Sequence, residues 1–241
     1  MVNKFEDFKS ASPGGIREYY RGRLLSQLDI SELAYVHLEC SGVRIHVKNG
    51  VLSSSLYDLC QAVSASFNNV RTKQYVPLLG CFSILDQIGC AYALRESDCR
   101  FENGIKRALY DFGEIKDAER LKQLVTLRHG LFHNGSLVNK SRHGDTNVFF
   151  RMTTEGDELL VPPLKEWDGS YSDDLTEYVT KINLSHLYSR VQHVVESCKS
   201  KLLEGKIDFM VQSERELFYK YLFKTPLPTP QKMETAFGNL L

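Results

Sequence analysis

The sequence predicts a mostly α-helical fold, built as a helical bundle in a single domain with small β-hairpin additions. Apolar residues recur at helical spacing through most of the chain, whereas alternation with a period of two is confined to two short regions. Residues 75–94 are almost wholly apolar, which is typical of a central buried helix. The chain has 241 residues, of which 42% are hydrophobic, and this is enough for one sizeable core.

The helical segments follow from the spacing of their apolar residues. Residues 14–28 and 52–69 carry apolar side chains every three or four positions. The apolar helix at 75–94 has Pro77 in its first turn, where proline is tolerated, and contains one acid, Asp86. Further helices are expected at 101–111, 116–134, 183–204 and 212–223.

Two β-hairpins are expected where the period changes from helical to two. The first covers residues 34–48 and turns at Ser41 and Gly42, so that apolar side chains pair on one face and polar ones on the other. The second joins residues 147–152 to residues 158–162 across a short polar connection. Both hairpins are small additions to the helical bundle.

We expect three parts along the chain. Residues 1–50 form an N-terminal appendage of a helix and a β-hairpin, and residues 51–205 form the main helical domain with a β-hairpin insertion near 146–163. Residues 206–241 form a last helix and an extended tail that contains several prolines. Neither an internal repeat nor a long linker interrupts this order.

Composition excludes several classes of protein. Lysine plus arginine equals aspartate plus glutamate at 30 each, and a neutral chain is a poor candidate for non-specific coating of nucleic acid by bulk charge. The N-terminal residues lack the apolar core of a secretion signal, and no stretch reaches the length of a membrane span. The six cysteines include no CxxC pair, so we expect reduced thiols in a soluble cytoplasmic protein without membrane contact.

The residues that carry chemistry are concentrated at the end of the predicted helix 116–134. Arg128, His129 and His133 lie within one and a half turns. His129 and His133 are four positions apart and share a helix face, whereas Arg128 and His133 are five positions apart, about 140° around an ideal helix. A long arginine side chain and a loosened last turn are needed to bring all three to one cleft.

Two features of the same segment indicate more than an ordinary helix end. Gly130 costs about 1 kcal/mol of helix stability relative to alanine, and such a glycine often permits close approach of another backbone. Asn134 and Gly135 supply a left-handed stop to the helix.

The segment resembles the Arg-polar-x-x-x-His motif of the HEPN superfamily, helical domains that carry this motif near the end of a central helix. Arg128, His129 and His133 match the motif position by position. The order of an apolar helix with an acid, the motif helix and a C-terminal amphipathic helix also fits, and the resemblance covers about residues 50 to 205.

The resemblance implies a metal-independent endoribonuclease without a cofactor, acting in a defence or toxin–antitoxin setting. It implies a homodimer that brings two motifs to one cleft, with an antitoxin or regulatory protein as a further partner. His133 is expected to serve as general base or acid, Arg128 to hold the phosphate, and His129 to position it. The ribose 2′-OH then attacks the adjacent phosphate of RNA and leaves a 2′,3′-cyclic phosphate, so DNA is inert.

Asp86 and Asn134 are the supporting candidates. A buried carboxylate is costly unless it is paired, and Arg128 is an obvious partner for Asp86. The alternative, equally open from sequence, is that Asp86 faces solvent or lies at a kink near Gly89.

Other interpretations of the motif remain open. Arginine and histidine in a last helical turn often only complement the helix dipole. His129 and His133 have the spacing of half a zinc site, but further ligands at suitable spacing are missing and the Glu of a metalloprotease motif is replaced by Gly130. A non-catalytic module for RNA or nucleotide binding or for dimerisation, and an inert helical scaffold, are the rival functions.

Overall fold

The computed structural model describes residues 2–40, 44–140 and 147–227. Helices hold 51% and strands 15% of these residues, and the strands form three sheets, one of them a mixed sheet of four strands. The fold is therefore a mixture of α and β structure. The predicted mostly α helical bundle with small hairpin additions is wrong, because strands far apart in the sequence pair with one another.

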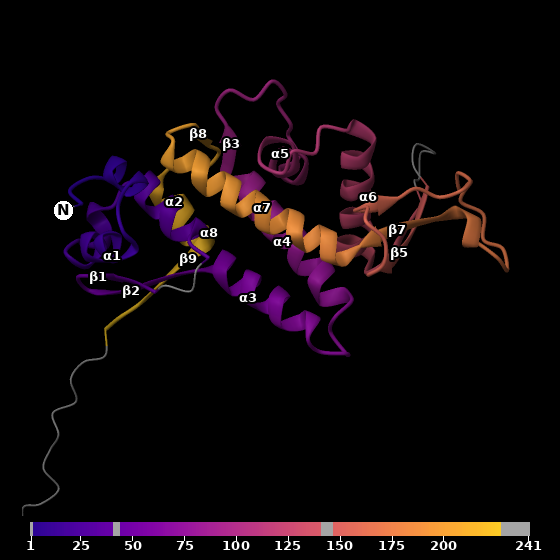
Figure 1. Cartoon of the computed structure of the whole chain (residues 1–241), viewed down its shortest axis with the longest axis horizontal. Helices are drawn as coiled ribbons and strands as arrows, with labels where there is room; N and C mark the ends of the chain where they lie inside the picture. The colour runs from indigo at the N-terminus through magenta and orange to yellow at the C-terminus, as the bar shows by residue number, and fades with distance from the viewer. Residues whose placement is uncertain (1, 41–43, 141–146, 228–241) are drawn as a thin grey trace, which may run out of the picture.

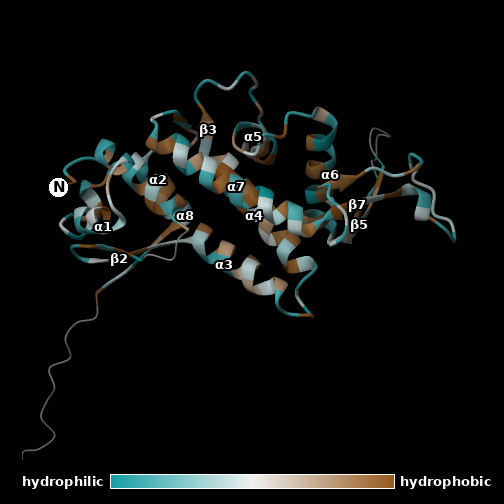
Figure 2. Ribbon diagram, in the orientation of Figure 1, coloured by the Kyte–Doolittle hydropathy of each residue, from teal (hydrophilic) through white to brown (hydrophobic). Residues whose placement is uncertain are grey.

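Two long helices form the centre of the molecule. α4 (Tyr75–Ala91) and α7 (Leu184–Leu203) pack against each other and extend along the long axis, with α3 (Ser55–Phe67) and α5 (Gly104–Asp111) on either side (Figure 1). The hydropathy colouring shows apolar residues where α4 and α7 meet (Figure 2). The prediction of a central buried helix at 75–94 is confirmed up to residue 91.

α4 and α5 approach so closely that only glycine fits between them. A Cβ on Gly89 would come within 1.7 Å of the backbone oxygen of Gly104. The contact fixes α5 against the C-terminal half of α4, the half that contains Asp86.

Side-chain caps set the starts of several helices. The Ser54 hydroxyl accepts from the backbone N–H groups of the first turn of α3, and the Asn183 side chain does the same for α7. Each cap satisfies backbone donors that have no partner within the helix.

One end of the molecule contains the N-terminal helices, the last helix of the chain and a three-stranded sheet. The helices are the 3₁₀ turns Phe5–Lys9 and Leu25–Gln27, α1 (Pro13–Arg21), α2 (Ile30–Leu38) and α8 (Glu214–Tyr221). The sheet has the order β1–β2–β9, formed by β1 (Ile45–Val47), β2 (Gly50–Ser54) and β9 (Leu222–Thr225), all antiparallel.

The predicted hairpin over 34–48 is wrong. Residues Ile30–Leu38 are helical, because Asp29 and Glu32 form a reciprocal cap at the start of α2. The alternation of apolar and polar residues that favoured a strand requires His37 to lie on a solvated face. The His37 side chain is instead fully buried. The predicted turn at Ser41–Gly42 lies outside the described residues, and the hairpin that exists joins β1 to β2 across residues 48–49.

The other end of the molecule contains the four-stranded sheet, in the order β4–β5–β7–β6. Its strands are β4 (Val138–Asn139), β5 (Val148–Thr153), β6 (Leu160–Val161) and β7 (Val179–Asn183), with the 3₁₀ turn Thr176–Tyr178 just before β7. A third sheet pairs β3 (Tyr92–Leu94) with β8 (Ile207–Phe209).

The predicted second hairpin is also wrong in its pairing. β5 and β6 occupy the predicted segments, but they do not pair with each other. β7 lies between them, parallel to β5 and antiparallel to β6. β7 alternates exposed Lys181 with buried Thr180 and Ile182, and this short alternating pattern was the signal that could have revealed it.

A single hydrophobic core runs through the described residues, from Phe8 to Leu222. The division into residues 1–50, 51–205 and 206–241 stays a prediction, although one sheet combines strands from each of these parts. Within the described ranges, no helix has both the length and the apolar character needed to cross a bilayer.

Candidate functional site

The motif lies on α6 (Ala118–Asn134), which starts at an Asp117 side-chain cap. The helix ends at Gly135, whose φ of 61° is left-handed, so the predicted stop is confirmed. Gly130 is buried, and a Cβ there would lie 2.8 Å from the backbone oxygen of Ser136. The chain therefore folds back directly onto the last turn of α6 as it enters β4, and this close approach accounts for a glycine inside the helix.

Arg128 and Asp86 form an ion pair between α6 and α4. The guanidinium donates from Nε at 3.1 Å and from Nη2 at 2.9 Å, both to Oδ2 of Asp86. The two side chains are 28% and 27% exposed, so the pair lies at the boundary of the core and solvent. Of the two predictions for Asp86, pairing with Arg128 is the one present. Asp86 is thus not a free surface carboxylate.

His129 and His133 lie together on the exposed side of the last turns of α6. Their ring centroids are 4.3 Å apart with an interplanar angle of 47°. Both residues are exposed, and so is Asn134. Neither imidazole donates to or accepts from another described residue, so both rings keep their nitrogens for solvent or a ligand.

Phe132 is a further contact of Arg128. It follows Arg128 by one turn, its ring is 41% exposed, and the Arg128 guanidinium carbon lies 5.0 Å from the ring centroid. Asp86 and Phe132 thus hold the guanidinium from two directions. Sequence reasoning missed Phe132, whose spacing from Arg128 was the available signal.

The structure brings the predicted residues together as two pairs on one helix end. Arg128 pairs with Asp86 on α4, and the His129 ring lies tilted against the His133 ring, but no hydrogen bond within the described part joins Arg128 to either imidazole. Asn134 terminates the helix beside them without a side-chain hydrogen bond to the described residues. The end of α6 therefore carries the cation and the two imidazoles, with Arg128 held at the boundary with α4 and both imidazoles exposed.

The surface next to Asp86 has further charged neighbours. Cys90 follows Asp86 by about one turn of α4, and burial together with the Asp86 carboxylate raises the pKa of its thiol. The positive charges of Arg107, Lys220 and Arg128 lower the pKa of the Cys90 thiol. All three cations therefore lie near this end of α4. Lys220 is paired with Glu216 at 2.6 Å.

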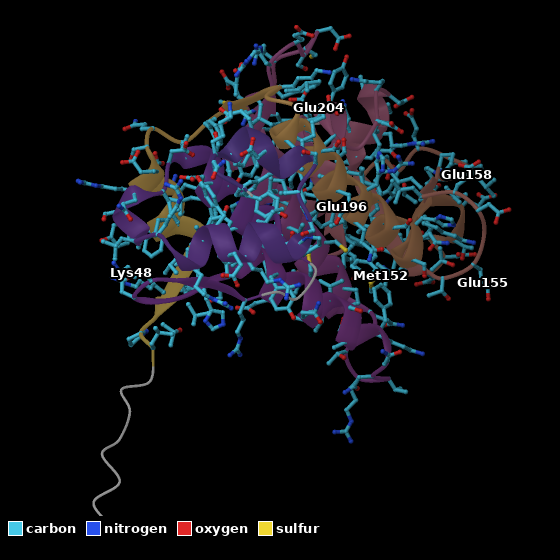
Figure 3. The ribbon with its side chains drawn as sticks, turned by 60° about the vertical axis from the view of Figure 1, so that its left-hand side comes forward. Lys48, Met152, Glu155, Glu158, Glu196 and Glu204 are labelled. Atoms are coloured by element: carbon cyan, nitrogen blue, oxygen red, sulfur yellow. The ribbon has the colours of Figure 1, made fainter. Side chains whose placement is uncertain are left out.

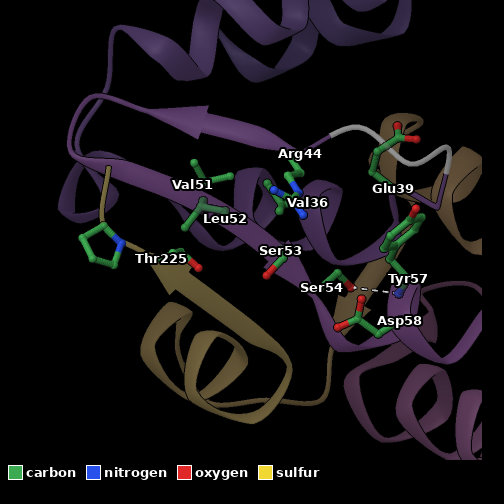
Figure 4. Close-up of a pocket in the computed structure, with 11 residues that line it drawn as sticks. Val36, Glu39, Arg44, Val51, Leu52, Ser53, Ser54, Tyr57, Asp58 and Thr225 are labelled. Carbon is green, nitrogen blue, oxygen red and sulfur yellow. Dashed lines mark hydrogen bonds between the residues drawn. The ribbon is translucent and has the colours of Figure 1, made fainter. Parts of the chain in front are cut away.

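The best-formed cavities of the described residues lie elsewhere. One of about 510 Å³ lies between the β1–β2 strands, the end of α2 and the start of α3, lined by Glu39, Arg44, Tyr57 and Asp58 among others (Figure 4). It contains none of the motif residues. The motif is thus an exposed helix end, a geometry suited to a large ligand or to a second protein surface more than to an enclosed small molecule.

No group of three His, Cys, Asp or Glu side chains gathers as a set of metal ligands within the part of the chain that the structure describes. His129 and His133 supply two imidazoles, and the nearest carboxylate of the motif, Asp86, is engaged by Arg128.

The chain matches no family model, and no curated protein or solved structure resembles it significantly. The HEPN resemblance therefore rests on the motif residues and their placement on α6.

Proposed function

We propose that the protein is a metal-independent endoribonuclease of HEPN type, with Arg128, His129 and His133 as its catalytic residues and Asp86 and Asn134 in support. The observation that carries the proposal is the Arg128–Asp86 pair beside two free imidazoles on one helix end. A cation held in place and two imidazoles that can accept and donate protons are the minimum for phosphodiester cleavage by an internal nucleophile.

The roles follow from what each side chain has available. His133 takes the proton of the ribose 2′-OH or gives one to the leaving 5′-oxygen. Arg128 neutralises the charge that builds on the phosphate oxygens; Nη1 makes no hydrogen bond to a described residue and is therefore available to the phosphate. His129, 4.3 Å from the His133 ring, positions the phosphate or orients its neighbour.

Asp86 acts as a positioning residue. Two hydrogen bonds to one carboxylate oxygen fix the plane of the guanidinium, and this reduces the rotamer freedom that binding would otherwise remove. Asn134 completes the helix at the point where the two imidazoles emerge.

A homodimer is part of the proposal. An open surface leaves the phosphate in water, and a second copy of the motif supplies a cleft. The exposed apolar residues on the two helices of the motif support such an interface: Val76 and Leu79 lie on α4 about two to three turns before Asp86, and Phe132 lies on α6. A defence or toxin setting in the cytoplasm, with an antitoxin or regulatory protein as partner, follows from the resemblance.

A non-catalytic RNA- or nucleotide-binding module is the second candidate, and one observation favours it. The Asp86 carboxylate neutralises part of the Arg128 charge, which weakens transition-state stabilisation more than it weakens the docking of a polyanion. The two candidates share a binding surface and differ only in turnover.

The experiment is incubation of the purified chain with a mixed RNA pool in EDTA, beside the His133→Ala variant. We expect cleavage by the wild type alone, with 2′,3′-cyclic phosphate ends, and no cleavage of DNA of the same sequence. His46→Ala is the matched control, since His46 is also exposed but lies on β1. Intact RNA that nevertheless shifts in a binding assay would select the binding module, and cleavage by His133→Ala at the wild-type rate would remove the proposal.

A further inference from the structure

Two cysteines, Cys40 and Cys60, lie close together where the end of α2 meets α3, away from the motif on α6. The Cys40 thiol donates to the Cys60 sulfur, and the two sulfurs are 3.8 Å apart. Cys40 follows the last turn of α2, and Cys60 lies in the middle of α3. A disulfide requires the two sulfurs to close from this distance to a bonded distance of about 2.05 Å.

The pair is accessible as well as close. Both cysteines are half-buried, whereas Cys81 and Cys198 are fully buried in the core. The cavity of Figure 4 is lined by Glu39, which adjoins Cys40 in the chain, and by Tyr57, which lies one turn before Cys60 on α3. The cavity therefore borders both segments that carry the thiols, and its volume exceeds that of a peroxide molecule.

The hydrogen bond makes the two thiols chemically unequal. Donation from Cys40 lowers the pKa of the Cys60 thiol, and the same bond, with burial, raises the pKa of Cys40. The acidic groups that face the pair are Glu39 and Glu196, and Figure 3 shows Glu196 in the middle of α7. Glu39 is held by Lys199 at 2.7 Å, which offsets part of its charge. In the oxidation chemistry proposed below, Cys60 is the attacking thiol and Cys40 the resolving thiol.

We propose that Cys40 and Cys60 form an oxidation site at which a hydroperoxide converts the two neighbouring thiols to a disulfide. The proposal does not depend on the ribonuclease activity. The bond joins the end of α2 to α3 and closes residues 40–60, which include the β1–β2 hairpin, into a covalent loop.

The chemistry balances with hydrogen peroxide as the oxidant. The Cys60 thiolate attacks one peroxide oxygen, the O–O bond breaks, and the departing hydroxide takes up the thiol proton as water, leaving a sulfenic acid on Cys60. The Cys40 sulfur then attacks the Cys60 sulfur, and its proton leaves with the hydroxyl group as a second water. The two thiols lose two electrons, and one peroxide is reduced to two waters.

The test uses the full chain, reduced and then treated with one equivalent of hydrogen peroxide before the remaining thiols are alkylated. Non-reducing tryptic digestion should give residues 24–44 linked to residues 49–71, lighter by two hydrogen atoms than the sum of the two peptides. Two of the six thiols should disappear together. In Cys40→Ser, dimedone should trap a sulfenic acid on Cys60, whereas Cys60→Ser should give neither sulfenic acid nor disulfide.

Cys99→Ser is the matched control, because Cys99 is also partly exposed but has no thiol neighbour among the described residues; it should oxidise as the wild type does. The oxidised protein should melt several degrees above the reduced protein, since the cross-link restricts the unfolded chain. Full alkylation of Cys40 and Cys60 after peroxide, a link from Cys60 to Cys81 instead, or an oxidation rate that rises with added urea would overturn the proposal. The last result would show that the bond forms only in unfolded chains.

Discussion

Arg128 reaches across from α6 and donates two hydrogen bonds to a single carboxylate oxygen of Asp86 on α4. The pair is the one described ionic link between these two helices, and it carries the group that the proposed chemistry needs most. Because the pair is partly buried, its attraction stabilises the fold more than that of an exposed pair, and its desolvation penalty is smaller than that of a fully buried pair.

Removing the carboxylate should separate the structural and functional roles of this pair. We expect Asp86→Asn to lower the free energy of unfolding by about 1–2 kcal/mol, because the amide is a weaker acceptor for a partly buried guanidinium. RNA cleavage should fall about tenfold or more, mainly in kcat, since Arg128 loses its fixed orientation. Denaturant titration and single-turnover kinetics measure the two effects.

Asp208→Asn, which breaks the more exposed Arg95–Asp208 pair, is the matched control and should leave cleavage unchanged. Equal loss of cleavage in both variants would show that Asp86 has no special role.

Arginine itself should not be replaceable by lysine at position 128. Lysine keeps the charge but cannot hold Asp86 with one part of its head group and a phosphate with another. We expect Arg128→Lys to fold with a stability within about 1 kcal/mol of the wild type and to lose most of its cleavage activity. Wild-type activity in Arg128→Lys, measured on the same RNA, would show that only the charge matters.

Gly130 should resist substitution although alanine is the better helix former. Helix propensity alone predicts that Gly130→Ala stabilises the protein by about 1 kcal/mol. The Cβ would meet the backbone oxygen of Ser136 at 2.8 Å, so we expect destabilisation by about 1–3 kcal/mol. Urea denaturation gives the sign directly. Gly156→Ala, at a left-handed position with open space around it, provides a comparison in which backbone conformation is the only strain.

His37 should make the protein less stable in mild acid. It is fully buried, its Nδ1 lies 2.7 Å from the Tyr92 hydroxyl, and burial lowers its pKa from 6.5 to about 4. Between those two values the unfolded chain binds a proton that the folded chain does not, so the free energy of unfolding falls as the pH falls. The slope contributed by this group is at most about 1.4 kcal/mol per pH unit.

Urea titrations from pH 7 to pH 4 test this prediction, with His37→Gln expected to flatten the dependence. An NMR titration of the wild type should show one imidazole that stays neutral until the pH is close to 4. A His37 signal that titrates near 6.5 in the folded protein would contradict the assigned cause.

The parts of the fold that were predictable from sequence are those in which local pattern and burial agree. The central helix was evident because a long, almost wholly apolar run has only a buried position available, and the cost of a lone carboxylate in that helix made the Asp86–Arg128 pair one of two open alternatives. The strand predicted in the region 34–40 was wrong because the period-two interpretation required His37 to face water. The hydrogen-bond partners of the His37 ring, Tyr92 and Gln87, are 50 or more positions away in the sequence.

The predicted strand pairing in the four-stranded sheet was wrong for a related reason. β5 and β6 were located, but their pairing depends on β7, which follows after a long connection and inserts between them. The alternation of β7 could have revealed the strand itself, but local sequence does not indicate that this strand inserts between β5 and β6. Within the site, the spacing of four positions correctly placed His129 beside His133, whereas the stacking of Arg128 on Phe132 depends on the rotamer that Asp86 imposes.

The pairing of β2 with β9 has a consequence for synthesis on the ribosome. Ser54 is the register partner of Leu222, so two neighbouring residues of one sheet are separated by 168 positions, from 222 − 54. A nascent chain can form the β1–β2 hairpin early, but the other edge of β2 stays unpaired until residue 222 has left the exit tunnel. During that interval, an exposed strand edge is a site for mispairing with other chains. We therefore expect folding yield to depend on translation rate and chaperone supply more than the stability of the finished protein would indicate.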